Sequence, residues 1–475
     1  MRLTLFLRGV VILVAAALAS ALAFAYVSRD GGMSAPHSDD ESQAISLDGV
    51  WRSRGYGWIW VIEEGRVRAY DESGELCLKS PRRSFHLDDS EKSLEASRDG
   101  KTIRLLLDDD QYRYVFDRID ALPASCTAET KSDPISVFDA VVTTLTTHYA
   151  FFGARDIDWE KAVEAERAKV TAGTSDWELF KSISRLLSHF RDSHVSLEGT
   201  IGDDDLEFDP SDEGRFHANS RMRESAEALA DPSGYWNPRA AEELLGDTAR
   251  TGADGDMTYG LIDGDIGYLA IREMSGFSRS KADKALERAM AMFEDAVAVI
   301  VDVSRNDGGY DSIARQIAGH FAGERTLAYF KYPGDAAEVE SQAIFVEPRS
   351  GEAPFPRPVF LITGRGTVSA AEIFVMAMRA LPNVTQVGEA TDGSLSDILS
   401  KPLPNGWSLT LSNEVYLDSE GIGWEGTGIP PEIAVAISDS RATDRAIEAT
   451  RRLIEHLRSV ASGATAAPPA AAKNF

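Results

Sequence analysis

The feature that most constrains the fold of this chain is a succession of uninterrupted apolar segments that alternate with segments of helical spacing. In chain order these are 266–271 (apolar), 279–293 (helical), 296–302 (apolar), 312–321 (helical), 359–362 (apolar) and 373–381 (helical). Strands without a polar face belong to a largely covered sheet, as in α/β layers. The sequence therefore predicts an α/β layered domain, which we assign to residues 257–437.

A small all-β domain is expected ahead of it, over residues 46–126. Short aromatic and β-branched runs predict antiparallel hairpins that form a small barrel or sandwich. The turn pairs that separate these runs are Glu64-Gly65, Ser73-Gly74 and Asp99-Gly100. No set of catalytic residue types gathers in this stretch, so its role is open.

Helices are expected to form a cap segment over residues 134–200. Apolar residues recur at helical spacing in its first part, and a later helix opens at the capping box Ser175-x-x-Glu178. The acidic stretch 201–256 is expected to be an irregular surface loop. The predicted order ends with a helix over 438–460 and a disordered Ala/Pro tail over 461–475.

The N-terminal segment predicts export. Residues 10–27 are almost wholly apolar and follow Arg2 and Arg8, which is the layout of a secretory signal or a membrane anchor. We therefore assign residues 1–29 to a signal peptide or anchor and residues 30–45 to a linker. Either assignment implies a periplasmic or other extracytoplasmic protein, which is secreted or tethered to the membrane.

Composition excludes some partners and cofactors. With 76 acidic and 49 basic residues, the formal net charge is -27, which argues against nucleic acid as a partner. The two cysteines, Cys77 and Cys126, fit a disulfide or two buried thiols equally well. Because the cysteines and histidines lack ligand spacing, no metal or organic cofactor is expected.

Ser369 is the candidate nucleophile, and two interpretations of it compete. It follows the apolar segment 359–362 and the glycines Gly364 and Gly366, and a helical segment follows it. A strand, a tight turn and a helix that begins at a serine are how several hydrolases present a nucleophile. The same residues, Ser369-x-x-Glu372, also form a capping box.

The donors of an oxyanion hole are expected on two segments. Ala370 would be in the first turn of the helix, where backbone N–H groups have no intrahelical partner. Gly308 and Gly309 follow the apolar segment 296–302, and glycines at the end of a strand let backbone amides approach a ligand. Gly308 or Gly309, together with Ala370, is therefore the predicted oxyanion hole.

Five motifs in order resemble the tail-specific protease family of serine peptidases. This family includes C-terminal processing proteases, the tricorn protease core and the interphotoreceptor retinoid-binding protein. The resemblance covers about residues 135–437 and implies a crotonase-like, layered α/β (α+β) catalytic domain with a nucleophilic Ser369. The motifs are at residues 267–271, 301–309, 367–372, 388–393 and 426–432.

The resemblance leaves the identity of the general base to be decided. In C-terminal processing proteases, a lysine follows the motif at 388–393, but here Ser394 is at that position. Lys401 lies seven residues later, beyond the matching position. Tricorn-like members instead resemble this chain around His194, so His194 is the candidate base, with His189 and His148 as rivals.

The orienting acid of tricorn-like enzymes is similar in place to Glu425, and Glu372 is expected to support the nucleophile. The resemblance thus implies a serine peptidase that cleaves peptides or unfolded proteins with a triad of Ser369, His194 and Glu425. The PDZ domain typical of the family is missing, because only about sixty residues separate His194 from Tyr259. The alternatives are an apolar-ligand-binding protein on the same scaffold and an esterase or amidase of small substrates.

Overall fold

The computed structural model describes residues 46–80, 85–87, 92–107, 111–210, 216–218, 244–349 and 355–435, with residues 451, 454, 455 and 458. The predicted signal or anchor (1–29), linker (30–45), tail (461–475) and most of the helix 438–460 lie outside the described residues. Within the described ranges, no helix combines the length and the apolar character that a membrane span needs.

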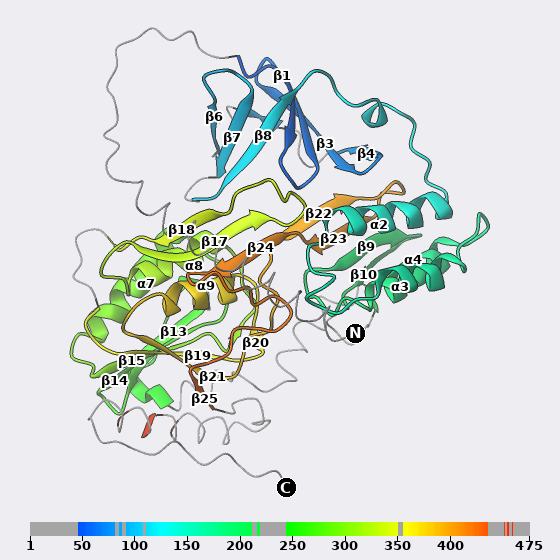
Figure 1. Ribbon diagram of the computed structural model, residues 1–475. Coiled ribbons are helices and arrows are strands. Elements are labelled where there is room, and N and C mark those ends of the chain that lie inside the picture. The colour runs from blue at the N-terminus through cyan, green and yellow to red at the C-terminus, as the bar shows by residue number, and fades with distance from the viewer. Residues whose placement is uncertain are drawn as a thin grey trace, which may run out of the picture.

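A seven-stranded mixed sheet is the centre of the C-terminal half of the chain (Figure 1). In spatial order its strands are β12 (Arg250–Gly252), β13 (Met257–Ile262), β14 (Ile266–Ile271), β15 (Ala298–Asp302), β19 (Val359–Thr363), β21 (Val384–Gly388) and β25 (Ile433–Ala434). The strands from β14 to β25 are parallel. Every residue of β14, β15 and β19 is buried, which confirms the predicted covered sheet.

Helices lie between this sheet and a second, smaller one, which gives the predicted α/β layers (Figure 1). The helices are α7 (Arg279–Met292), α8 (Asp311–Gly319) and α9 (Ala370–Arg379), and the antiparallel sheet is β18 (Gln342–Val346), β17 (Thr326–Pro333) and β24 (Glu414–Asp418). Nine of the ten residues of α9 are buried, because it packs between β17 and β21. The helix that follows Ser369 is therefore fixed in the core.

Helices α2 (Pro134–His148), α3 (Trp159–Arg167) and α4 (Asp176–Leu187) form the cap segment. Helix α3 packs on α4, and α2 and α4 pack on a five-stranded sheet. The sheet consists of β11 (Phe216–Ala218), β10 (Asp204–Phe208), β9 (Ser196–Ile201), β23 (Ser408–Ser412) and β22 (Ile398–Pro402). Glu178 N–H donates to Ser175 Oγ at 3.3 Å, so α4 begins at the predicted capping box. Since β22 and β23 come from the C-terminal half of the chain, the sheet joins the cap to that half.

The stretch 201–256 differs from the irregular loop that the sequence indicated. β10 pairs with β9 and β11, and β12 joins the central sheet. Leu206 and Phe208 of β10 are buried at alternate positions while its acidic residues face outward, so two apolar side chains fix a strand in a polar stretch. Residues 211–215 and 219–243 lie outside the described residues.

The eight-stranded antiparallel sheet at the N-terminal end is called the β domain here. Its strands are β1 (Gly49–Ser53), β2 (Trp58–Glu63), β3 (Arg66–Ser73), β4 (Leu76–Lys79), β5 (Phe85–His86), β6 (Lys92–Ala96), β7 (Thr102–Leu107) and β8 (Arg113–Ile119). The order is β4-β3-β2-β1-β8-β7-β6, with β5 paired to β3. A disulfide joins Cys77 of β4 to Cys126 of the short helix η3 (Ala124–Cys126). The β domain lies over β17, β18, β22 and β24 (Figure 1).

Candidate active site

Ser369 lies at a strained turn between β20 (Gly366–Thr367) and α9. Its φ of 57° and ψ of −127° are rare for a residue other than glycine. β20 pairs in parallel with β16 (Arg305–Asn306), and Val368 N–H donates to the Asn306 carbonyl at 3.0 Å. A half-buried serine on a strained strand-to-helix turn has the geometry of a nucleophile elbow.

Glu372 is fully buried next to Ser369, and its carboxyl group accepts hydrogen bonds from backbone N–H groups. Its Oε2 accepts hydrogen bonds from the N–H groups of Ser369 (3.3 Å) and Ser394 (2.9 Å), and its Oε1 accepts one from Gly393 N–H (2.8 Å). Ser369 N–H also donates to the Ser394 carbonyl at 3.0 Å. Burial raises the pKa of Glu372 to about 8. Glu372 therefore ties the turn at Ser369 to the segment after β21.

The backbone N–H groups of Gly309 and Ala370 donate no hydrogen bond within the described part of the chain. Gly308 lies directly against the serine, since a Cβ on Gly308 would be 2.7 Å from Ser369 Cβ and 3.0 Å from Ala370 N. Gly308 also has a φ of 101°, so glycine is required there. The N–H of Gly308 donates to Asn306 Oδ1 at 2.9 Å, which leaves Gly309 and Ala370 as the available donors.

His194 lies in the loop between α4 and β9 and is 5% exposed. Its N–H donates to Asp192 Oδ1 at 3.0 Å, and its carbonyl accepts from Thr410 Oγ1 at 2.8 Å. The ring Nδ1 is buried and makes no hydrogen bond to a described residue. Burial lowers the pKa of His194, and the charges of Asp192, Asp397 and Asp392 oppose this effect. A lowered pKa favours the uncharged ring at neutral pH, and this is the form that accepts a proton.

Arg155 joins the loop of His194 to the segment that contacts Ser369. Its Nη1 donates to the Arg191 carbonyl at 2.6 Å and its Nη2 to the Gly393 carbonyl at 2.8 Å. Its Nε lies 3.4 Å from Asp192 Oδ2. Sequence analysis did not identify Arg155, because it lies in the irregular stretch after α2 and belongs to none of the recognised motifs.

Glu425 is buried, but it does not contact His194 as a triad acid would. Its Oε1 accepts from Arg155 Nη2 at 2.6 Å, and its Oε2 accepts from the N–H groups of Leu395 (2.9 Å) and Ser396 (3.0 Å). Burial raises the pKa of Glu425 to about 7. No hydrogen bond between Glu425 and His194 is present in the described part of the chain. The expected direct contact is thus replaced, because the guanidinium and two amides already engage both carboxylate oxygens.

The rival bases lie elsewhere. Lys401 is 1% exposed, and its Nζ donates to the Tyr56 carbonyl of the β domain at 2.5 Å. The ring of His148 is 2.5 Å from Asp335 Oδ2 and 3.0 Å from the Glu72 carbonyl, at the contact of α2 with the β domain. His189 is exposed near the end of α4. Like His194, none of the three has a described contact with Ser369.

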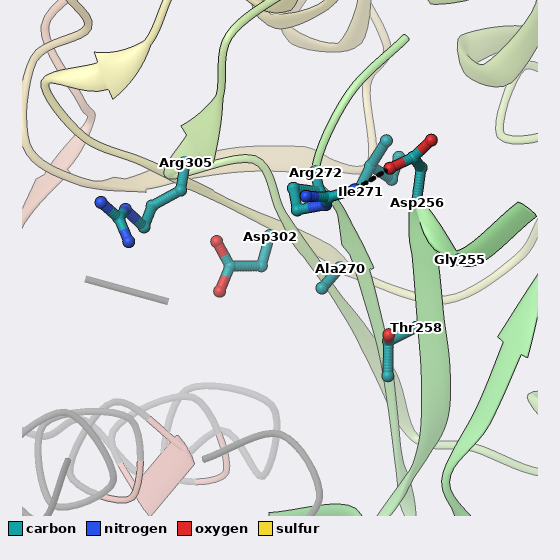
Figure 2. Close-up of a pocket in the computed structure, with 8 residues that line it drawn as sticks. All are labelled: Gly255, Asp256, Thr258, Ala270, Ile271, Arg272, Asp302 and Arg305. Carbon is teal, nitrogen blue, oxygen red and sulfur yellow. Dashed lines mark hydrogen bonds and ion pairs between the residues drawn. The ribbon is translucent and has the colours of Figure 1, made fainter. Parts of the chain in front are cut away.

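A small cavity at the carboxyl ends of β14 and β15 contains none of the predicted site residues (Figure 2). Its volume is about 10 Å³, which is the space of a single water molecule. Two of its carboxylates are already engaged: Asp256 pairs with Arg272 of the same lining at 2.5 Å, and Asp302 accepts from Tyr268 at 2.7 Å. In the described ranges, no three His, Cys, Asp or Glu side chains are grouped so as to hold a metal ion.

Comparisons with known proteins agree with the family resemblance. Residues 265–435 match the model of Peptidase family S41. The Carboxy-terminal-processing protease of Bartonella bacilliformis is 22% identical over 176 residues, which are 37% of this chain and 39% of that protein. Carboxy-terminal processing protease CtpB of Bacillus subtilis is 25% identical over 176 residues, which are 37% of this chain and 35% of that protein. The chain thus matches little more than a third of the length of these relatives.

A solved structure extends the likeness beyond the matched segment. The crystal structure from Parabacteroides merdae, assigned as a peptidase, has a TM-score of 0.55 and 26% identity, and the match covers 70% of this chain and 97% of that one. The likeness in fold therefore extends beyond residues 265–435.

Proposed function

We propose that this chain, a member of peptidase family S41 through its residues 265–435, is a serine peptidase that hydrolyses peptide bonds through an acyl-enzyme. The observation that carries the proposal is the turn at Ser369. A serine at φ 57° begins a buried helix, and Gly308 fits against it without a side chain. A plain helix cap requires neither the strained serine nor the close approach of a second loop.

His194 is the proposed general base. It would take the proton of Ser369 Oγ as the oxygen attacks the substrate carbonyl, and would return that proton to the leaving amine. The N–H groups of Gly309 and Ala370, which have no other acceptor among the described residues, would stabilise the tetrahedral oxyanion. A water molecule, deprotonated by His194, would then hydrolyse the acyl-enzyme and restore the serine.

Glu425 is proposed to act on His194 through Arg155 and not by direct contact. Arg155 contacts both Glu425 and Asp192, and Asp192 accepts the N–H of His194. Through these contacts, Glu425 would fix the position of the loop that contains His194. Glu372 would fix the position of Ser369 by its bonds to the segment 393–394.

The proposed substrates are peptides or unfolded proteins, and the proposed location is outside the cytoplasm. The names of the two relatives refer to carboxy-terminal processing, which supports a polypeptide substrate. A disulfide between Cys77 and Cys126 is typical of oxidising compartments, which supports export with residues 1–29 as signal or membrane tether.

The decisive experiment is labelling with a fluorophosphonate, read by intact mass. The wild-type protein and Ser175→Ala should gain one adduct, whereas Ser369→Ala should gain none. Ser175 is the matched control, because it is also a capping serine followed three residues later by a glutamate. Labelling that persists in Ser369→Ala, or no labelling of the wild type, would reject Ser369 as the nucleophile.

Hydrolysis assays then separate the candidate functions. His194→Ala should abolish cleavage of an unfolded protein substrate, because the serine loses its base. A labelled protein that cleaves only small esters would be an esterase. A protein that neither labels nor cleaves would fit the binding-protein alternative.

A further inference from the structure

Lys331 of β17 is a buried cation at the contact between the β domain and the catalytic layers. It is 3% exposed, and its Nζ lies 2.6 Å from Glu414 Oε2 on the neighbouring strand β24. The rings of Tyr112 and Tyr416 lie 4.9 and 5.0 Å from the same nitrogen. A buried charge is costly unless it is paired, so the groups around Lys331 must stay in place together.

Two further carboxylates near Lys331 belong to the segments that flank Ser369. Lys331 Nζ lies 3.8 Å from Asp311 Oδ2 and 3.7 Å from Asp397 Oδ2. Asp311 is the first residue of α8, two residues after Gly309. Asp397 directly follows Leu395 and Ser396, whose N–H groups bind Glu425. A single ammonium group is therefore shared between the loop that contains Gly308 and Gly309 and the segment after Ser394.

The β domain reaches the same cluster through Tyr56. The Tyr56 hydroxyl lies 2.6 Å from Glu414 Oε1 and 2.8 Å from the Tyr112 hydroxyl. Because a tyrosine has one hydroxyl proton, Tyr56 donates to the carboxylate and accepts the proton of Tyr112. Tyr56 is 3% exposed and Tyr112 is 2% exposed, so this contact is closed to water.

Other contacts hold Tyr56 against the catalytic layers. Its backbone N–H donates to Asp335 Oδ2 at 3.1 Å, and its carbonyl accepts from Lys401 of β22. On the other side of the cluster, Glu414 N–H donates to Ser396 Oγ at 3.0 Å. A chain of polar contacts thus runs from the β domain through Glu414 to the segment that binds Glu425.

We propose that the β domain positions the two loops of the active site through the contact of Tyr56 with Glu414, and that Lys331 of β17 is a second positioning residue beside this contact. Without the ammonium group, Asp311, Asp397 and Glu414 would lose the cation that they share, and the segments that carry them would no longer be held together. Gly309 and the segment 394–396 would move with them, and small displacements of catalytic groups cost much of the rate. This inference rests on the proposed function only for its effect on hydrolysis.

Amide hydrogen exchange tests the positioning independently of activity. In Lys331→Met and in Tyr56→Phe, segments 305–312 and 392–398 should exchange faster than in the wild type, while helix α4 should not change. Gln342→Ala is the matched control. It removes a contact between the same two units, because Gln342 bonds to both N–H and C=O of Arg113. Gln342 pairs with Lys331 across β17 and β18, but its side-chain bonds go to Arg113 and not to the residues of the cluster. Unchanged exchange in both segments, or an equal increase throughout the chain, would overturn the proposal.

Kinetics normalised to the fluorophosphonate-titrated sites give the second readout. Lys331→Met should lower kcat by about tenfold or more with KM nearly unchanged, and Tyr56→Phe should lower it less, because only one hydroxyl is lost. Gln342→Ala should retain the wild-type kcat. Full kcat per titrated site in both Lys331→Met and Tyr56→Phe would refute the inference. If the wild type is inactive but Lys331→Met and Tyr56→Phe still show the exchange pattern, only the proposed function is refuted.

Discussion

Ser369 shows how a single residue can fit two descriptions. The sequence offered a helix cap and a nucleophile as competing interpretations, and the local geometry accommodates both. Ser369 precedes α9, and its N–H donates to Glu372, as in a capping box. Its positive φ, however, is a cost that a cap does not need. The sequence pattern around Ser369 does not predict its φ angle, so the evidence for a strained turn comes from the structure.

The proposed base leads to a prediction about pH. Because burial lowers the pKa of His194, its neutral form should persist below the ordinary value of 6.5. We expect kcat/KM to rise with pH to a half-maximum below 6.5 and to be constant at pH 7. Asp392→Asn removes a charge that raises this pKa, so the midpoint should fall, and it should fall less in high salt.

The measurement is a pH-rate profile of the wild type and of Asp392→Asn at low and high ionic strength. A half-maximum above pH 8 would point to a lysine and not to His194. An upward shift in Asp392→Asn would contradict the proposed electrostatics around the ring.

Sequence motifs pointed to individual residues but not to the contacts between them. Gly308 and Glu372 contact the turn at Ser369, whereas the loop of His194 is linked to the segment 393–394 through Arg155. Arg155 was missed because a single arginine in an irregular stretch has no spacing to recognise. Glu425 was expected to orient His194, but its partner in the structure is Arg155, because motif order does not reveal which cation lies next to a carboxylate.

At the scale of elements, the first turn of α9 connects the turn at Ser369 with the segment 393–394. The first turn of α9 carries Glu372, whose carboxyl group binds three N–H groups from Ser369 and the segment 393–394. This arrangement buries the carboxyl group completely, and burial raises its pKa to about 8. Relative to an ordinary value of 4.5, the folded state therefore binds a proton more tightly than the unfolded state does.

Stability should therefore depend on pH through Glu372. The contribution of a raised pKa is fully present below about 4.5 and is lost as the pH rises through about 8. Glu372→Gln removes this titration. As the pH rises through that window, the unfolding free energy of the wild type should therefore fall relative to that of Glu372→Gln by about 1 kcal/mol per pH unit. Urea unfolding of both proteins at pH 5, 6.5 and 8 measures it. A difference that is independent of pH would contradict the assignment.

For the whole molecule, the sequence predicted layers but not how they meet. Apolar strands and helical spacing predicted the covered sheet, since both patterns are local. The docking of the β domain depends on pairs far apart in sequence, such as Tyr56 with Glu414 and Lys331 with Tyr112. Lys401 illustrates the difference: in sequence it was a distant candidate base, and in the structure it is a buried contact to the β domain.

The disulfide between Cys77 and Cys126 should stabilise this β domain. It closes a segment with a sequence separation of 49, and in the chain-entropy model a loop of that size gives about 4 kcal/mol. We expect Cys77→Ser with Cys126→Ser to lose about 2–4 kcal/mol of unfolding free energy, measured by urea denaturation. Replacing both residues avoids a free thiol that could form other disulfides.

The location of the loss distinguishes a local effect from a general one. Cys77 packs with Ile59, Val61 and Tyr70 in a small core of the β domain. Hydrogen exchange should therefore accelerate in β2 to β4 of the double variant and stay unchanged in α9. Because β2 directly follows the Tyr56 turn, strong local opening should also weaken the contact with Glu414 and lower kcat. Equal stability with and without the disulfide would show that the sheet alone holds this domain together, and kcat should then be unaffected.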